Sequence, residues 1–483
     1  MKKLIFILMV LTGFASSCTK NFEDFNTDKK RPTEVPGDFL FANAQKALAD
    51  QIASTNVNLN VWKLWAQYWT ETTYTDEANY DIVNRTIADN TFRVFYRDIL
   101  ADLNEARKVI TAESAIGELA IANQRNRLYI IDLLECYSYN HLLEAFGDIP
   151  YSEALDITNL SPKYDDALTV YKDLLSRSKA AAEGLNAGSI NEFEVGSFGE
   201  NDLYYAGDVA MWIKFANSLQ VKMAITLADA DNATAKSYIE SAYPGAFTMG
   251  ENANLVYLGG SNSNPLYIDM VQSGRDDFVP ANTIIDIMNA LNDPRRDDYF
   301  FANGEIYQGG IYGESSPFGQ LSHVSDPIQA PTFPMVLLDY TEIAFYLAEA
   351  AERGYAVGGS AESYYISGIT SSILHWGGTA TDVSDYLAQT SVAYSTATGT
   401  WKQKIGTQAW LAYYVRGMEG YTSWRRLDFP ILNIAPAIET YDEIPVRFTY
   451  PIREQTLNGA NYAAASSAIG GDELTTKLFW DKF

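Results

Sequence analysis

Long segments with helical periodicity recur along this chain, and they restrict its fold more than any other feature. In the segment 339–352, Ile343, Leu347 and Ala350 fall on one face of a helix. The segment 119–146 is apolar nearly all round, as expected for a buried helix. Alanines let helices approach closely, so we predict a mainly α fold of antiparallel helix pairs, without a readable repeat period. The predicted helices are 39–52, 89–110, 119–146, 167–185, one opening at 207–220, 339–352 and several between 364 and 424.

One stretch, 244–334, has a different composition and interrupts this helical pattern. It is rich in Gly, Asn, Pro, Ser and Tyr, and it contains only one clear helical segment, 280–291. A connection of this length between helices is typical of a functional excursion or a small subdomain. We therefore predict an irregular, loop-rich region packed on the helical scaffold, within a single domain that spans 37–483.

The first eighteen residues carry the features of an export signal. Lys2 and Lys3 precede an apolar run, and three small residues precede Cys18. A cysteine at this place resembles the bacterial lipobox, in which the cysteine becomes the acylated N-terminus. The alternative is an ordinary signal peptide with an incidental cysteine, but the chain has only two cysteines. We predict removal of 1–17, lipidation of Cys18 (palmitate or a similar acyl chain) and a polar tether over 18–36.

Composition excludes several classes of function. The formal net charge is −26, and loss of Lys2 and Lys3 makes it more negative, so an electrostatic nucleic-acid partner is not expected. With Cys18 acylated, Cys136 has no partner and no disulfide framework can form. A small buried thiol is the simplest interpretation of Cys136.

Aromatic residues, which are abundant here, provide the candidate ligand contacts. Trp62, Trp65 and Trp69 have the spacing of one helical face, which favours a place in the core. Tyrosines off this face or in the polar loop after it are better candidates, because exposed rings stack on sugars and grip peptide side chains. The candidate binding residues are Tyr68, Trp69, Tyr74, Tyr80, Tyr267, Tyr307 and Tyr312.

Catalytic motifs are not apparent in the sequence. None of the three histidines, His141, His323 and His375, lies in an H-E-x-x-H arrangement, and no G-x-S-x-G elbow occurs. The segment 24–28 imitates part of a calcium loop, but Lys29 replaces its glycine. We predict a protein without catalytic residues, cofactor or metal. The alternative is a surface-anchored glycan hydrolase, which needs only two facing carboxylates.

Several segments together resemble the SusD/RagB family of nutrient-binding outer-membrane lipoproteins. They occur in the family's order, from the lipobox to the last residues of the chain, and so cover nearly all of it. The matching segments are 65–68, 208–219, 293–295, 340–350, 424–426 with Pro430, and 444–447 running into Tyr450 and Pro451.

The resemblance implies a fold, a location and a partner. The fold is a scaffold of four tetratricopeptide-type helix pairs that carries an irregular ligand-binding region. The location is the outer membrane, with the lipid-anchored chain facing the cell surface. The partner is a TonB-dependent transporter of the SusC type, on which the chain acts as a lid that captures an oligosaccharide or a peptide for import. Ligand contacts vary within the family, so no binding residue is carried over.

Lipidation can be tested on Cys18. In cells that lack a SusC-type partner, Cys18→Ala is expected to move the protein from the membrane fraction to the soluble fraction, because it removes the predicted lipid anchor. Fractionation followed by immunoblotting measures this directly. A variant that stays with the membrane would contradict lipid anchoring.

Overall fold

The computed structural model describes residues 35–436 and 443–482. The chain divides into two compact units, Met1–Pro36 and Gly37–Phe483, and the account below concerns the second. The signal segment 1–17, Cys18, the calcium-loop imitation at 24–28 and the tether up to residue 34 lie outside the described residues, so the predictions made for them stay predictions.

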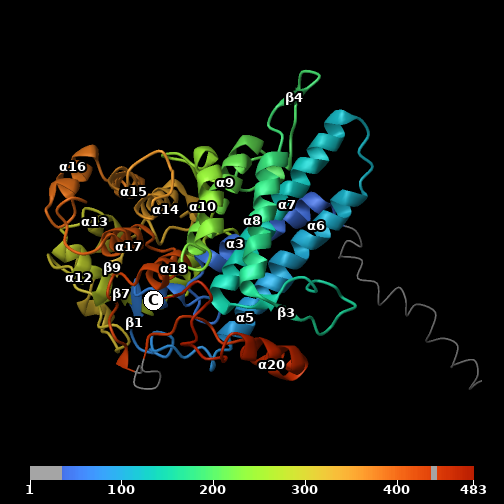
Figure 1. The fold of residues 1–483 in the computed structure, drawn as a ribbon. Helices are drawn as coiled ribbons and strands as arrows, with labels where there is room; N and C mark the ends of the chain where they lie inside the picture. Colours follow the sequence, from blue (N-terminus) through green and yellow to red (C-terminus); the bar gives the residue numbers. More distant parts are fainter. Residues whose placement is uncertain (1–34, 437–442, 483) are drawn as a thin grey trace, which may run out of the picture. The chain divides into compact units, whose positions relative to one another are not determined.

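The body of the second unit is a scaffold of paired helices, which confirms the mainly α prediction (Figure 1). Consecutive helices pack on one another, α6 on α7, α7 on α8, α8 on α9, α9 on α10, α14 on α15 and α17 on α18, and α3 packs on α6. The scaffold helices are α3 (Gly37–Ala53), α6 (Ala101–Ala112), α7 (Glu118–Phe146), α8 (Ala167–Gly184), α9 (Val209–Thr226), α10 (Asn232–Ala242), α14 (Tyr340–Glu352), α15 (Ala361–His375), α16 (Ala380–Ala388), α17 (Trp401–Ala412) and α18 (Gly417–Leu427).

Local signals in the sequence fix where several of these helices begin and end. The carboxylate of Asp208 accepts hydrogen bonds from the amides of Ala210 and Met211 at the start of α9. Asp339 caps α14 in the same way through the amide of Glu342. Gly147, with φ of 85°, ends α7, a backbone conformation that favours glycine. The predicted bounds therefore agree with the structure to within about two residues, the usual uncertainty of helix ends.

The tryptophan stripe lies in the core, as predicted, but it does not lie on one helix. The helix α4 (Trp62–Trp65) ends after four residues, Gln67 has φ of 57°, and Trp69 begins the strand β1 (Trp69–Glu71). β1 pairs with β7 (Phe278–Pro280), which places Trp69 opposite Pro280. The strand partner is more than 200 residues away along the sequence (about 69 to 280), so helical spacing alone did not reveal it.

The predicted helix 89–110 is helical throughout but changes its winding. It consists of α5 (Ile87–Arg93), a π-helical segment η1 (Val94–Leu100) and then α6. A π-helical turn contains an additional residue, which shifts the side chains that follow around the helix axis. The buried face continues through the change in winding, since Phe95, Ile99 and Leu103 are all buried.

The loop-rich region 244–334 contains the predicted helix 280–291, observed as α12 (Asn282–Ala290), together with short strands and helices that the sequence did not predict. Its strands form two-stranded antiparallel ladders, one with β1 and one with a strand before α14, so the region is hydrogen-bonded to the scaffold at two places. The remaining elements are β2 (Ile149–Pro150), β3 (Tyr164–Asp165), β4 (Ser189–Ile190), β5 (Phe193–Glu194), η2 (Gly199–Asn201), η3 (Tyr243–Gly245), β6 (Asn252–Leu255), α11 (Pro265–Tyr267), η4 (Ile268–Gln272), α13 (Arg296–Tyr299), β8 (Phe300–Phe301), η5 (Phe318–Gln320), β9 (His323–Val324), β10 (Met335–Asp339), α19 (Ile452–Leu457) and α20 (Gly459–Ala468).

Buried ion pairs join the scaffold helices to one another. Glu342 on α14, which is fully buried, accepts from Lys222 of α9 at 2.6 Å and from Arg416 at 2.9 Å. About two helical turns further along α14, Glu349 pairs with Arg426 of α18 at 2.6 Å. A buried charge without a partner is strongly destabilising, so these matched charges fix how α9, α14 and α18 pack.

The arginine pair 425–426 is structural. The partner of Arg426 is Glu349. Arg425 donates to the backbone carbonyls of Glu144 and Val446. Neither guanidinium faces solvent.

Two reactive side chains in α7 are also structural. Cys136 is a buried free thiol, and burial raises its pKa to about 11, which keeps it protonated. His141 stacks on Phe95 with ring centroids 4.7 Å apart, and burial lowers its pKa to about 3. The predicted role of Cys136 as a small buried thiol is confirmed. None of the helices in the described ranges combines the length and hydrophobicity that a bilayer span needs.

The buried ion pairs predict a large effect of a small substitution. Glu342→Gln removes the carboxylate that Lys222 and Arg416 share in the core and leaves them only Glu419 at 3.7 Å and Asp339 at 3.1 Å, which is expected to lower the free energy of unfolding by about 3–5 kcal/mol. Chemical denaturation measures this. The control is Glu362→Gln on the exposed face of α15, which should change it by less than about 0.5 kcal/mol. Equal effects of the two substitutions would contradict the structural role of the network.

Candidate ligand-binding site

Exposed rings and aliphatic side chains gather on a set of loops beside the scaffold, which we call the loop face. Its members are Tyr74, Phe301, Tyr307, Ile311 and Phe318. Tyr74 is 65% exposed, Phe301 44% and Ile311 57%, and the rings of Tyr307 and Phe318 are half-buried. Exposed apolar groups in one area are typical of a contact surface.

Backbone hydrogen bonds hold the loop of Tyr74 against the loop of Ile311. The amide of Ser316 donates to the carbonyl of Thr72 at 2.9 Å. The side-chain amide of Asn79 donates to the carbonyl of Gly313 at 2.7 Å. Gly313 has φ of 76° and lies against Pro436, so the close approach of these loops requires glycine there. The loops are therefore fixed before any ligand arrives.

Polar side chains support the other rings of the loop face. The guanidinium of Arg296 lies over the ring of Tyr307 at 4.3 Å from its centroid. Phe318 stacks on His323 with centroids 3.9 Å apart. The strands β8 and β9 pair Phe301 with His323, which connects Phe301 to the same group.

Four of the predicted binding residues are buried and do not present a ring to a ligand. Tyr68, Trp69 and Tyr80 are 0% exposed and Tyr312 is 1% exposed. The expectation that Tyr68 and Tyr80 are exposed is therefore wrong, as is the choice of Trp69 and Tyr312. The hydroxyl of Tyr68 donates to the carbonyl of Trp410 at 2.6 Å, and Trp69 Nε1 donates to Tyr414 Oη at 2.9 Å.

The other three predicted residues keep some exposure, and Tyr74 keeps the most. Tyr267 ends α11 and Tyr307 lies in the loop before Ile311, each half-buried. Sequence reasoning missed Phe301. The available signal was the pair Phe300–Phe301, because adjacent residues of a strand point to opposite faces, so the two rings face different surroundings.

A pair of buried carboxyl groups lies at the base of the Tyr74 loop. Glu71 is 4% exposed and Glu77 1%, and both are at the ends of the segment that carries Tyr74. Glu71 accepts from the amide of Ala78 at 2.9 Å, while Glu77 pairs with Arg85. Burial, with the neighbouring Glu77 carboxylate, raises the pKa of Glu71 to about 9, so Glu71 holds a proton at neutral pH.

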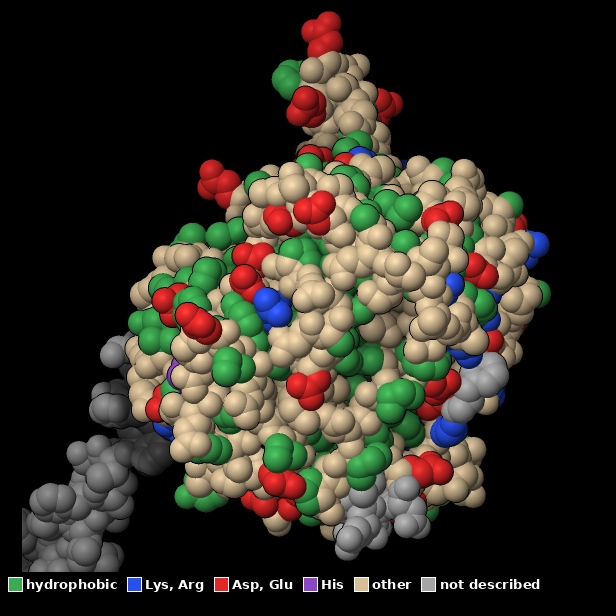
Figure 2. Space-filling view, turned by 90° about the vertical axis from the view of Figure 1, so that its left-hand side faces the viewer, with side chains coloured by type: hydrophobic (Ala, Val, Ile, Leu, Met, Phe, Trp, Pro, Cys, Tyr) green, Lys and Arg blue, Asp and Glu red, His purple; other side chains and the backbone are tan. Residues whose placement is uncertain are grey.

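Charge on this side of the molecule is largely negative. Figure 2 shows the side on which α12, α13 and α16 lie in Figure 1, with hydrophobic and acidic side chains spread over it and few Lys or Arg. Such a surface repels anionic ligands, whereas a neutral ligand can bind to it without this repulsion. Stacking on rings and hydrogen bonds to neutral hydroxyls remain as binding forces here.

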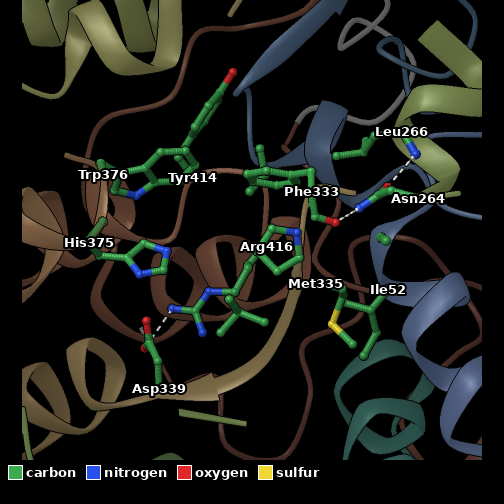
Figure 3. A pocket seen from close by; sticks show the side chains of 15 residues that line it. Ile52, Asn264, Leu266, Phe333, Met335, Asp339, His375, Trp376, Tyr414 and Arg416 are labelled. Carbon is green, nitrogen blue, oxygen red and sulfur yellow. Dashed lines mark hydrogen bonds and ion pairs between the residues drawn. The ribbon is translucent and has the colours of Figure 1, made fainter. Parts of the chain in front are cut away.

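A cavity between the scaffold and the loop-rich region is too small for a sugar. Figure 3 shows Trp376, Tyr414 and Phe333 along its wall, with Arg416 and Asp339 joined at one side. Its volume is about 40 Å³, room for a few water molecules. A ligand ring would have to displace these side chains.

The described residues contain no candidate metal site. Within 35–436 and 443–482, no three His, Cys, Asp or Glu side chains are grouped to hold a metal ion. The neighbouring carboxyl groups of Asp76 and Glu77 do not share a site, since Asp76 is exposed on the loop whereas Glu77 is buried and paired with Arg85.

Comparison with protein families decides the identity of the fold. A family model described as "SusD-like, starch-binding associating with outer membrane" matches residues 29–451. The chain belongs to the SusD-like family. This confirms the resemblance read from the sequence, and with it the tetratricopeptide-type scaffold.

Solved structures of SusD-like proteins cover nearly the whole chain. A chitin-binding protein matches with a TM-score of 0.78 and 23% identity over 92% of this chain and 100% of its own. A SusD homologue from Bacteroides uniformis has a TM-score of 0.76 and 24% identity over 92% and 99%. A chitin-binding SusD homologue from Flavobacterium johnsoniae has 0.76 and 20% over 92% and 97%. A search of curated proteins finds no match.

Membership of the SusD-like family indicates the general role of this protein. The SusD-like family binds glycans in association with the outer membrane and is not catalytic. The alternative of a surface-anchored hydrolase is therefore wrong. The residues of the family segments are structural here, since Asp293, Arg295, Glu342 and Arg426 are all buried in ion pairs.

The proton on Glu71 predicts that stability falls with rising pH. The unfolded carboxyl ionises near 4.5 and the folded one near 9, so the unfolded state gains stability from ionisation between these values. Glu71→Gln mimics the protonated acid and is expected to be more stable than the wild type at pH 8, by at least about 1 kcal/mol, with little difference at pH 4.5. Denaturation at both pH values measures this.

The control for this experiment is Glu194→Gln, which changes an exposed carboxylate on β5. It should give the same small difference at both pH values. A Glu71→Gln variant that is less stable than the wild type at pH 8 would contradict a protonated Glu71.

Proposed function

We propose that this SusD-like protein captures a neutral oligosaccharide at the cell surface and acts as a lid on a TonB-dependent outer-membrane transporter of the SusC type. The observation that carries the binding part is the loop face, where Tyr74 and its neighbouring rings are exposed on loops fixed to a rigid scaffold. Family membership supports the glycan ligand and the outer membrane.

The ligand class follows from the chemistry of the loop face. Sugars present C–H faces to aromatic rings and hydroxyls to amides and carbonyls, and this surface offers both. Two relatives of similar fold are described as chitin-binding, which supports a glycan over a peptide. A peptide remains the second candidate, since the same rings would hold apolar side chains.

The mode of action is a lid that holds its ligand with moderate affinity. A few stacked rings on an open surface bind more weakly than a closed pocket, which allows release to the transporter. Cys18, as the predicted lipid anchor, would keep the protein beside the membrane. Opening is then a rigid-body swing in which the helix pairs keep their shape.

Tyr74→Ala tests the binding surface. In the soluble Cys18→Ala background, titration calorimetry with maltohexaose and with chitohexaose is expected to show at least tenfold weaker binding of whichever oligosaccharide the parent protein binds, a loss of about 1.4 kcal/mol. The melting temperature should stay unchanged because Tyr74 is 65% exposed.

The matched control is Phe193→Ala on the β4–β5 hairpin, a ring 66% exposed but outside the loop face. It should leave oligosaccharide affinity unchanged. Equal losses in both variants, or binding of an apolar peptide in place of both oligosaccharides, would contradict the proposal.

A further inference from the structure

A second concave site lies away from the loop face, between the end of α7, the start of α8, helix α20 and the C-terminal segment 476–479. We call it the C-terminal pocket. Its volume is about 450 Å³, within the range of small-molecule sites. Lys163, Tyr164, Asn461, Thr476, Lys477 and Phe479 are among the residues that line it, together with the buried Arg447.

The walls of the C-terminal pocket are tied together by hydrogen bonds. The side-chain amide of Asn461 donates to the carbonyl of Ser161 at 2.9 Å, which joins α20 to the loop before β3. Tyr164 Oη donates to Glu454 at 3.0 Å. Arg447 pairs with Asp472 at 2.8 Å and donates to the carbonyl of Phe146 at 2.9 Å. A pocket built this way exists before a ligand enters it, which lowers the entropy cost of binding.

Cationic side chains with spare donors distinguish this pocket from the loop face. The side chains of Lys163 and Lys477 are 52% and 46% exposed, and their carboxylate neighbours Asp165 and Asp481 lie at 3.4 and 3.7 Å. Each ammonium has three donors, so at least two remain for a ligand. These donors favour a ligand that carries an anionic group.

Acidic side chains line the same pocket. Asp166 is engaged as the cap of α8, where its carboxylate accepts from the amide of Thr169, and Asp148 accepts from the amide of Ala167. The two lysines are therefore the lining groups with donors available for a ligand.

Other groups of the pocket suit a sugar ring rather than a simple anion. The ring of Tyr164 is half-buried, and a row of alanines, Ala464, Ala465 and Ala468, gives an apolar surface for C–H groups. Asp148 uses one carboxylate oxygen for the amide of Ala167 at 2.8 Å, which leaves the other as a possible acceptor for a hydroxyl. An anion without hydroxyls would leave this carboxylate unused.

Another groove of similar volume differs from the C-terminal pocket in the side chains that line it. The groove between α3, η1 and η4 has a volume of about 410 Å³, but no aromatic ring lines it and its charged lining residues are Asp50, Asp98 and Asp269. It lacks both the ring and the cations that an acidic sugar requires. The C-terminal pocket has both.

We propose that the C-terminal pocket binds a saccharide that carries a carboxylate, a hexuronic acid, with the carboxylate held by Lys163 and Lys477 and the ring on the Tyr164 and alanine side. This site is separate from the loop face and does not depend on the function proposed for it. The protein could then bind an acidic sugar unit or branch of a glycan in this pocket, separately from the neutral part of the same glycan.

The experiment compares three small probes by saturation-transfer NMR and calorimetry on the Cys18→Ala protein. D-glucuronate is expected to bind at least tenfold more tightly than D-glucose, which lacks the carboxylate, and than acetate, which lacks the ring. The double substitution K163A/K477A is expected to reduce glucuronate affinity at least tenfold. K482A, a matched change of one exposed lysine outside the pocket, is expected to leave it unchanged.

The outcomes separate this site from the loop face and from loss of folding. Tyr74→Ala should not change glucuronate affinity, and melting temperatures of the lysine variants should match the parent because both side chains are about half exposed. No glucuronate binding, equal binding of glucose or acetate, or binding that survives K163A/K477A would each overturn the proposal. Failure of maltohexaose and chitohexaose to bind would overturn only the loop-face function.

Discussion

The pairing of buried charges around Glu342 is the constraint on which the rest of the structure depends. Lys222, Glu342 and Arg416 come from three different parts of the chain and meet where water is excluded. Apolar packing alone tolerates small slips between helices, whereas a buried carboxylate between two cations does not. Arg416 also pairs with Asp339, at the point where β10 joins the loop-rich region to α14, so the same network sets where that region begins.

The scaffold and the loops thus have different roles in the protein. Paired helices with capped ends and matched charges provide rigidity, and the exposed rings proposed to contact a ligand lie on loops hydrogen-bonded to them. Binding residues on loops can change without disturbing the core. This explains how the family segments identify the fold while saying nothing about the ligand, because Asp293, Arg295, Glu342, Glu349 and Arg426 are all inside.

How much the sequence predicts differs between the scaffold and the site. Helices such as α7 and α9 follow from periodicity and local caps, because those signals lie within the helix itself. The prediction that Trp69 contacts a ligand is wrong, because the strand β7, distant in the sequence, pairs with β1 and sets the environment of Trp69. Tyr68, Tyr80 and Tyr312 fail for a related reason: the type of side chain does not reveal whether a distant segment covers it. Tyr74 and Phe301 differ from them only in lacking such a cover.

The buried proton between Glu71 and Glu77 links the loop of Tyr74 to the acidity of its surroundings. Ionisation of Glu71 in alkaline medium would place a second negative charge beside Glu77 beneath this loop, where both carboxyl groups are buried. The loop would therefore lose stability as the pH rises toward the pKa of Glu71, whereas mild acidification would leave it unchanged.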